Sequence, residues 1–395
     1  MNDGRRRRNA KQARRHTKCS AKRQHSNLEP GSLQQLVRTS LAKHPVHLLD
    51  VAAYPIARAT PDRHAFLKAE CEEPLRLGDV VAALADDPCR EITALLSVLA
   101  ELLVEDEEVR AQCHQALATR ADRLPTWIAE LSRVHVHRAV RRALVLGDGD
   151  EILVGARLAG GAELTIATYV DHNELSSLQE ISVFGCSIAE VLAEVDTNMD
   201  PDTAYLDMSL ADARAWIEQG LGKAEFLPHP DAWRWSLPIV KWLVKRMPDG
   251  GVGRQGPDFD DDALPQLLAD FFASAAGAPF RDPDYEHLLV ELFDSGSRDP
   301  RLWSATRVEG LLRSTDTGEA FPLEIALDVP AVLRAFVPFA HAQNEVRAEH
   351  TDRTLAAIDD MSRTYKQNLL KEATSMYEED EPGPPPWWGD RNQAS

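Results

Sequence analysis

Residues 138–184 read RAVRRALVLGDGDEILVGARLAGGAELTIATYVDHNELSSLQEISVF, and this stretch decides the fold. Apolar side chains recur in four runs, at 138–146, 151–158, 162–170 and roughly 178–184. Their alternation indicates β-strands, because successive side chains of a strand point to opposite faces of a sheet. The Gly- and Asp-rich intervals between the runs favour hairpin turns, since glycine adopts positive φ at low cost. The stretch therefore predicts an antiparallel meander of three or four strands.

Most of the sequence outside the meander has helical periodicity, so we predict an α+β fold that is predominantly helical. A meander of this size is marginal alone, and helices are expected to cover one of its faces. A capping box at Ser187–Glu190 predicts one helix start after the meander, and Ser209 with Asp212 predicts another. Proline after aspartate predicts further helix starts at Pro283 and Pro300. Phe321–Leu327 is expected to form a short strand.

Changes in composition along the chain predict six segments. The first is a disordered basic arm at 1–28, and the last is a disordered acidic and Pro-rich tail at 377–395. Between them we expect a helical region, the meander with its helices, a linker-like segment with one helix, and a second helical region. These four segments cover residues 29–134, 135–227, 228–262 and 263–376.

Charge is distributed unevenly along the chain, whose formal net charge is −19. Residues 1–23 hold ten basic residues and one aspartate, a net charge of +9, which leaves −28 on the remaining chain. Such an arm neutralises phosphates and binds nucleic acid without sequence preference; the alternative is a solubilising tail that lies on the acidic body. The basic residues of the arm are Arg5, Arg6, Arg7, Arg8, Lys11, Arg14, Arg15, Lys18, Lys22 and Arg23.

The cysteines and the hydropathy indicate a cytoplasmic protein. The five cysteines are scattered and odd in number, which argues against a disulfide framework and for a reducing compartment. No apolar run approaches the 18 residues or so of a membrane span, so we expect no membrane contact. No apolar segment follows the arginines at 5–8, which excludes a secretory signal of the usual form.

The turn after the third strand holds the first candidates for catalysis, Asp171, His172 and Glu174, because functional side chains concentrate on loops at strand ends. No Walker A, GxGxxG, HExxH or GxSxG motif is present, so no cofactor is predicted. We also predict no resident metal. The pair His135 and His137 matches no zinc pattern, and the acidic loop 196–207 has proline where a calcium loop requires glycine. The carboxylates of 258–262 are expected to lie at a solvated helix start.

The C-terminal tail contains Pro384-Pro385-Pro386-Trp387-Trp388. Polyproline segments are preformed, and aromatic side chains serve as anchors, so Trp387 and Trp388 are candidate residues for docking a protein partner through 378–395. A plain tail without a partner is the alternative.

Two stretches, together with the arginine-rich start, resemble uncharacterised hypothetical proteins of high-GC Gram-positive bacteria. The first is 147–155, continuing to 169–173, and the second is 302–304 with 307–312, followed by 329–337. The resemblance implies a bacterial cytoplasmic protein, and it implies no activity and no site residues. The turn after the third strand reads Asn173-Glu174-Leu175, where we would expect a glycine-rich turn.

Three hypotheses on function follow from these observations. The first is a non-enzymatic accessory or interaction protein whose basic arm contacts nucleic acid or another polyanion. The second is an enzyme of unknown class with its site at the end of the meander. The third is a scaffold that docks a partner through the Pro/Trp tail.

Overall fold

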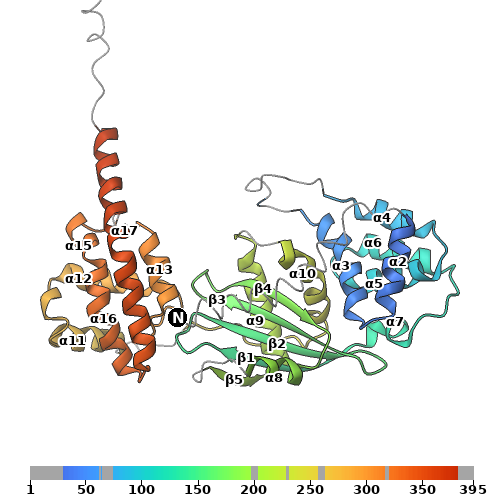
Figure 1. Cartoon of the computed structure of the whole chain (residues 1–395), viewed down its shortest axis with the longest axis horizontal. Helices are drawn as coiled ribbons and strands as arrows, with labels where there is room; N and C mark the ends of the chain where they lie inside the picture. The colour runs from blue at the N-terminus through green and yellow to red at the C-terminus, as the bar shows by residue number, and fades with distance from the viewer. Residues whose placement is uncertain are drawn as a thin grey trace, which may run out of the picture. The chain divides into compact units, whose positions relative to one another are not determined.

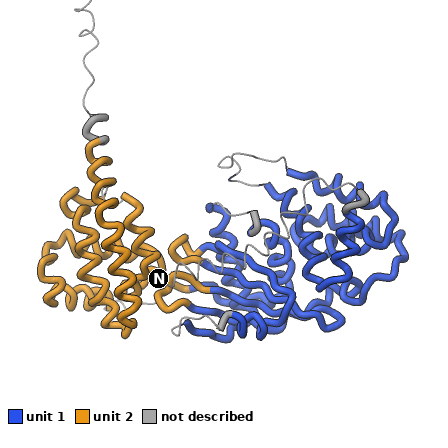
Figure 2. Tube along the Cα trace, viewed as in Figure 1, with its two compact units in different colours: residues 1–143, 151–170, 177–254 blue, residues 144–150, 171–176, 255–395 orange. Residues whose placement is uncertain are grey.

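The computed structural model describes residues 30–61, 64, 74–196, 203–227, 231–256, 263–315 and 320–380. These residues form an α+β protein that is mostly helical with one antiparallel sheet, as the sequence predicted. Contacts within the chain separate two compact units (Figure 2). Unit 1 comprises the described residues of 1–143, 151–170 and 177–254, and unit 2 those of 144–150, 171–176 and 255–395.

The sheet has five strands in the order β4-β3-β2-β1-β5 (Figure 1). The four strands of the meander were predicted. The prediction of three to four strands was nevertheless wrong, because β5 pairs antiparallel with β1, with Ala143 opposite Ala204 and Ala139 opposite Met208. β5 is a short edge strand with no buried residue and Leu206 47% exposed, so it lacks the apolar alternation of a half-buried strand. The strands are β1 His135–Ala143, β2 Gly149–Arg157, β3 Glu163–Asp171, β4 Ser177–Phe184 and β5 Ala204–Met208.

Helices cover both faces of the sheet. This explains why the central strands carry apolar side chains at both odd and even positions, which point to opposite faces. On one face Leu153 clusters with Ile188 and Val191 of α8 (Ile188–Asp196). On the other face Ile152 and Val154 belong to the main core of unit 1. There α9 (Leu210–Ala224) and α10 (Asp231–Val244) contact β4.

The predicted caps start helices where the sequence placed them. Ser187 Oγ accepts from the Glu190 N–H at 3.3 Å, and the Glu190 carboxylate accepts from the Ser187 N–H at 2.8 Å. Ser209 Oγ accepts from the Asp212 N–H at 3.0 Å at the start of α9. Both predictions are therefore confirmed.

The first helices of unit 1 pack around α5, whose Leu96, Val98 and Leu99 are fully buried. The Asp106 side chain caps α6 by accepting from the Val109 N–H at 3.0 Å. The helices are α2 Pro30–Leu41, α3 Val46–Ala59, α4 Leu77–Ala85, α5 Arg90–Leu102, α6 Glu107–Leu117 and α7 Thr126–Ala129, followed by the 3-10 turn η2 Leu131–Arg133.

Unit 2 is built around an aromatic cluster in which Phe336 contacts Phe271, Phe293 and Trp303. Pro283 occupies the first turn of α12, as predicted, and Asp282 caps that helix. Pro300, in contrast, starts no helix, because the cap of the next helix is Ser304. The helices are α11 Ala263–Ala273, η3 Ala278–Phe280, α12 Pro283–Phe293, α13 Ala305–Arg313, α15 Leu323–Leu327, α16 Val329–Gln343 and α17 Ala348–Asp380.

The expectation of a strand at Phe321–Leu327 was wrong, because residues 323–327 form the short helix α15. Residues 323–327 are too few for the spacing of their apolar side chains to distinguish a helix from a strand. Tertiary contact decides it, since the Tyr365 hydroxyl of α17 donates to the Ala326 carbonyl at 3.0 Å. Among the helices of the described ranges, none has the length and apolar content required to cross a bilayer.

Candidate functional site

A cluster of buried and half-buried polar side chains lies within unit 2. Its members come from the β1–β2 turn (144–150), from the β3–β4 turn (171–176) and from the segment leading into α13. Burying a polar group costs free energy unless the group is hydrogen-bonded, so the partners of each member decide whether the cluster is stable. The cluster comprises Asp148, Asp150, His172, Asn173, Ser176, Ser304 and Arg307.

His172 links both turns through its imidazole ring. Nε2 lies 2.8 Å from Asp150 Oδ2, and Nδ1 lies 3.1 Å from Ser176 Oγ. An ionised carboxylate only accepts hydrogen bonds, so Nε2 carries the proton and Nδ1 accepts from the Ser176 hydroxyl. The backbone N–H of His172 also donates to the backbone carbonyl of Asp148 at 2.8 Å. The arrangement is a serine–imidazole–carboxylate chain, which can move a proton away from Ser176.

The backbone that presents Ser176 is strained. Leu175 has φ +60° and Ser176 has φ +56°, a region that side chains with a Cβ seldom adopt. The glycine expected in this turn is absent, and the surrounding contacts hold the conformation instead. Such strain occurs most often at functional sites and ligand clamps. Leu175 is exposed, whereas Ser176 is only 9% exposed.

Asp148 joins the β1–β2 turn to α13. Its Oδ1 accepts from Asn173 Nδ2 at 3.0 Å and from the Ser304 hydroxyl. The same Ser304 oxygen caps α13 by accepting from the Arg307 N–H at 2.9 Å. Burial raises the pKa of Asp148, and the hydrogen bonds from Asn173 and Ser304 oppose this rise. The carboxylate therefore depends on its donors to remain charged.

The guanidinium group of Arg307 donates hydrogen bonds to protein oxygens. Nη1 donates to the carbonyls of Asp299 and Leu302 at 2.6 and 2.7 Å, Nη2 donates to the Phe293 carbonyl at 3.0 Å, and Nε donates to Ser295 Oγ at 3.1 Å. The guanidinium carbon also lies 3.9 Å from the centre of the Trp303 ring. Burial lowers the pKa of Arg307 to about 10, against the opposing charges of Asp299 and Asp148.

His341 extends the network behind Trp303. Nε2 accepts from the Trp303 N–H at 3.2 Å, so Nδ1 carries the proton and donates to Thr351 Oγ1 at 2.9 Å. Burial lowers the pKa of His341 to about 4. The ring is therefore neutral at neutral pH and fixes the segment that leads into α13.

Of the three catalytic candidates named from the sequence, the structure places His172 in the cluster. Asp171 Oδ1 accepts from the Asn173 N–H at 2.9 Å and so caps its own turn. Burial raises the pKa of Asp171 to about 6, and the charges of Asp148 and Glu174 add to the rise. Glu174 is exposed at the tip of the turn.

Sequence reasoning missed Asp148, Asp150, Ser176, Ser304 and Arg307. Asp148 and Asp150 were assigned to turn formation alone, because aspartate between glycines is typical of a hairpin. Ser304 precedes a helical run, and that cap pattern was an available signal. Nothing in the local pattern of Arg307 distinguishes it from an arginine on a solvated helix face.

The basic residues of 5–23 and the pair Trp387 and Trp388 lie outside the described residues, as do the carboxylates of 258–262. The rings of His135 and His137 lie on one face of β1 with centroids 6.0 Å apart. Of the acidic loop 196–207, residues 197–202 lie outside the described residues, Asp196 ends α8, and Asp207 pairs with Arg138 at 3.0 Å. Among the described residues, no group of three or more His, Cys, Asp or Glu side chains is arranged to hold a metal ion.

Comparison of the chain with protein-family models, with curated proteins and with solved structures finds no match.

Proposed function

We propose that this protein is a cytoplasmic interaction protein that contacts nucleic acid through the arginine-rich arm of residues 5–23. The observation that carries the proposal is the separation of charge, with +9 on residues 1–23 and −28 on the remaining chain. An arm with ten cations attracts phosphates, while a net negative body opposes contact with a polyanion elsewhere on its surface.

The buried cluster supports a structural role for unit 2 in this proposal. Its side chains donate to and accept from one another, and Arg307 is bound mostly to backbone carbonyls. Asn173 Oδ1 is buried without a hydrogen-bond partner among the described residues, whereas His172, Asp148, Ser304 and Arg307 are all bonded. Buried polar networks that are largely satisfied fix one arrangement of the chain. In this view the cluster holds the two meander turns against α13, and the folded body supplies the specific surface while the arm supplies affinity.

A salt series tests the proposal. The full chain is titrated with generic RNA and DNA between low and physiological salt, beside a full-length variant whose ten basic arm residues are glutamine and a chain lacking 1–28. We expect a steep loss of affinity with salt for the native chain, about 0.9 logarithmic units per decade of salt for each phosphate contact. The slope should disappear in both altered chains. Equal binding by all three chains, or no binding by the native chain at low salt, contradicts the proposal.

A second candidate function is acyl-group hydrolysis at Ser176. The Ser176–His172–Asp150 chain, together with positive φ at the serine, favours it. In this scheme Ser176 Oγ attacks the acyl carbon while its proton passes to His172 Nδ1, and the Asp150 carboxylate stabilises the resulting imidazolium. The imidazolium then returns the proton to the leaving group, and water repeats the sequence to release the acid.

A fluorophosphonate probe separates the second candidate from the first. A nucleophilic Ser176 should be labelled in the native chain, with the adduct located by peptide mass spectrometry. Labelling should be lost in Ser176→Ala and His172→Gln, and it should persist in Glu174→Gln, which changes the neighbouring exposed carboxylate. If the native chain takes up no probe at Ser176, the cluster is structural only.

A further inference from the structure

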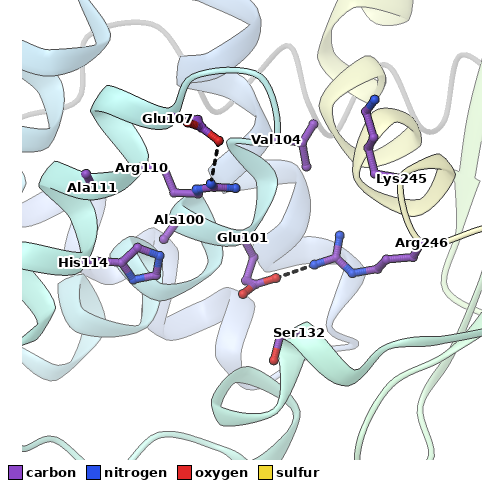
Figure 3. Close-up of a pocket in the computed structure, with 10 residues that line it drawn as sticks. All are labelled: Ala100, Glu101, Val104, Glu107, Arg110, Ala111, His114, Ser132, Lys245 and Arg246. Carbon is purple, nitrogen blue, oxygen red and sulfur yellow. Dashed lines mark hydrogen bonds and ion pairs between the residues drawn. The ribbon is translucent and has the colours of Figure 1, made fainter.

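A pocket of about 640 Å³ lies in unit 1, remote in sequence from the buried cluster (Figure 3). Its walls are the C-terminal half of α5, the helix α6, the turn η2 and the residues that follow α10. The volume falls within the range of sites that hold small organic ligands.

Charged and polar side chains line this pocket. Figure 3 shows the guanidinium groups of Arg110 and Arg246 reaching into it from opposite walls. Glu101 lies between these walls and pairs with Arg246 at 2.5 Å, while Arg110 pairs with Glu107 at 3.3 Å. The Glu107 side chain is 86% exposed, so its pair with Arg110 is weak and easily exchanged.

Three further polar side chains line the pocket. His114, Ser132 and Lys245 form no side-chain hydrogen bond or ion pair with the described residues. The pairs within the lining neutralise both glutamates, which leaves the Lys245 ammonium as an uncompensated charge. The pocket therefore has a local excess of positive charge in a protein whose net charge is −19.

Arg246 is anchored rather than mobile. Nη1 donates to the Trp242 carbonyl at 2.8 Å, and the guanidinium carbon lies 4.8 Å from the centre of the Trp242 ring. Its Nε is buried and has no hydrogen-bond partner among the described residues. Because Nε is buried, the donors left for a ligand are the second N–H groups of Nη1 and Nη2, beside those bound to the Trp242 carbonyl and to Glu101. A guanidinium fixed in this way is pre-organised for an oxyanion, and this lowers the entropic cost of binding.

We propose that this pocket binds a small phosphorylated ligand. A phosphate group carries up to two charges and several acceptor oxygens, which suits the donors of Arg110, Lys245 and Arg246. The carboxylates of Glu101 and Glu107 suit hydroxyl groups on the remainder of the ligand. Nucleic acid bound by the arm differs from this ligand in size and in site, so the two proposals are independent.

Protection of Lys245 from acylation tests the proposal on the full chain, with inorganic pyrophosphate as the probe. The protein is treated with an amine-acylating reagent with and without pyrophosphate at constant ionic strength, and modification is followed by peptide mass spectrometry. We expect pyrophosphate to slow acylation of Lys245 by about tenfold when the pocket is saturated. Lys43, an exposed lysine of unit 1, is the internal control and should react at an unchanged rate.

A double variant, Arg110→Gln with His114→Gln, assigns the protection to the pocket. Both side chains are at the surface of α6, so the fold should persist, and circular dichroism checks this. The variant should lose the protection of Lys245, whereas Arg157→Gln, which removes an exposed arginine of β2, should keep it. Acylation of Lys245 at equal rates with and without pyrophosphate overturns the proposal. Protection that survives in the double variant overturns it as well.

Discussion

The Nε2 atom of His172 lies 2.8 Å from Oδ2 of Asp150, and both side chains are almost completely removed from solvent, with 3% and 7% exposed. Asp150 is at the start of β2 and His172 follows the end of β3, so both lie at the same end of this antiparallel pair, away from the turn that joins the two strands. A hydrogen bond of this kind is worth most where water cannot replace it. The pair therefore couples the two turns within unit 2.

His172→Ala should destabilise the protein by about 2–4 kcal/mol, because it leaves Asp150 and Ser176 without their shared partner and opens a cavity. Chemical denaturation followed by circular dichroism measures the change. Glu174→Ala, two residues away and exposed, is the matched control and should change the free energy of unfolding by less than about 0.5 kcal/mol. Equal effects of the two substitutions would show that the imidazole is not an energetic link.

Arg307→Lys should cost about 3–5 kcal/mol, although it keeps the charge. A lysine cannot reproduce the donors that reach the Asp299, Leu302 and Phe293 carbonyls, and it cannot stack on Trp303 in the same way. Arg313→Lys, which alters an exposed pair with Glu309 on the same helix, should be nearly neutral. A tolerated Arg307→Lys would contradict the role assigned to the planar guanidinium.

Gly296→Ala should be strongly destabilising, by about 2 kcal/mol or more. The backbone at this position has positive φ, and neighbouring atoms leave no room for an added Cβ. Its φ is +60°, and an added Cβ would lie 2.6 Å from Asn173 Oδ1 and 2.9 Å from Arg307 Cδ. Gly310→Ala, in α13, meets no atom within 4 Å and should stabilise the helix by roughly 0.5–1 kcal/mol. Melting temperatures of the two variants should therefore move in opposite directions.

Asp171→Asn should stabilise the protein at neutral pH and have little effect at pH 4. The folded chain raises the pKa of Asp171 from 3.8 to about 6, so the folded state binds more protons than the unfolded state between these values. Stability contributed by this group is thus lost as pH rises from about 4 to 6. Asparagine retains the oxygen that accepts from the Asn173 N–H and removes the charge. Denaturation curves at pH 4 and pH 7 test the expectation, and a penalty at pH 7 would contradict it.

The contribution of His341 to the free energy of unfolding depends on pH in the opposite direction. Its pKa falls from 6.5 to about 4 on folding, so the unfolded chain binds the proton more readily, and stability is lost as pH falls through this window. In His341→Gln this loss should be absent, because glutamine does not titrate. The free energies of unfolding of the native chain and the variant, compared from pH 7 to pH 4, should therefore converge as the pH falls. A constant difference across this range would show that His341 does not titrate on unfolding.

The α+β class, the four strands of the meander and several helix starts could be predicted from the sequence. These features depend on local physics: the period of two in a strand, the glycine turns, and the caps at Ser187 and Ser209. Local physics was insufficient at residues 323–327, where a five-residue apolar run suits either structure and packing against α17 selects the helix.

The sequence by itself also determined that the turn at 171–174 holds ionisable side chains, and His172 was one of three catalytic candidates named there. Only the tertiary structure decided which partners it meets. Asp148, Asn173 and Ser304 are joined by hydrogen bonds, although 156 positions separate Asp148 from Ser304. The edge strand β5 is decided in the same way, because its pairing with β1 satisfies backbone groups and leaves no apolar pattern in the sequence. Periodicity records which side of an element is buried, and it carries no information on which distant residue lies opposite, since that depends on how the chain closes on itself.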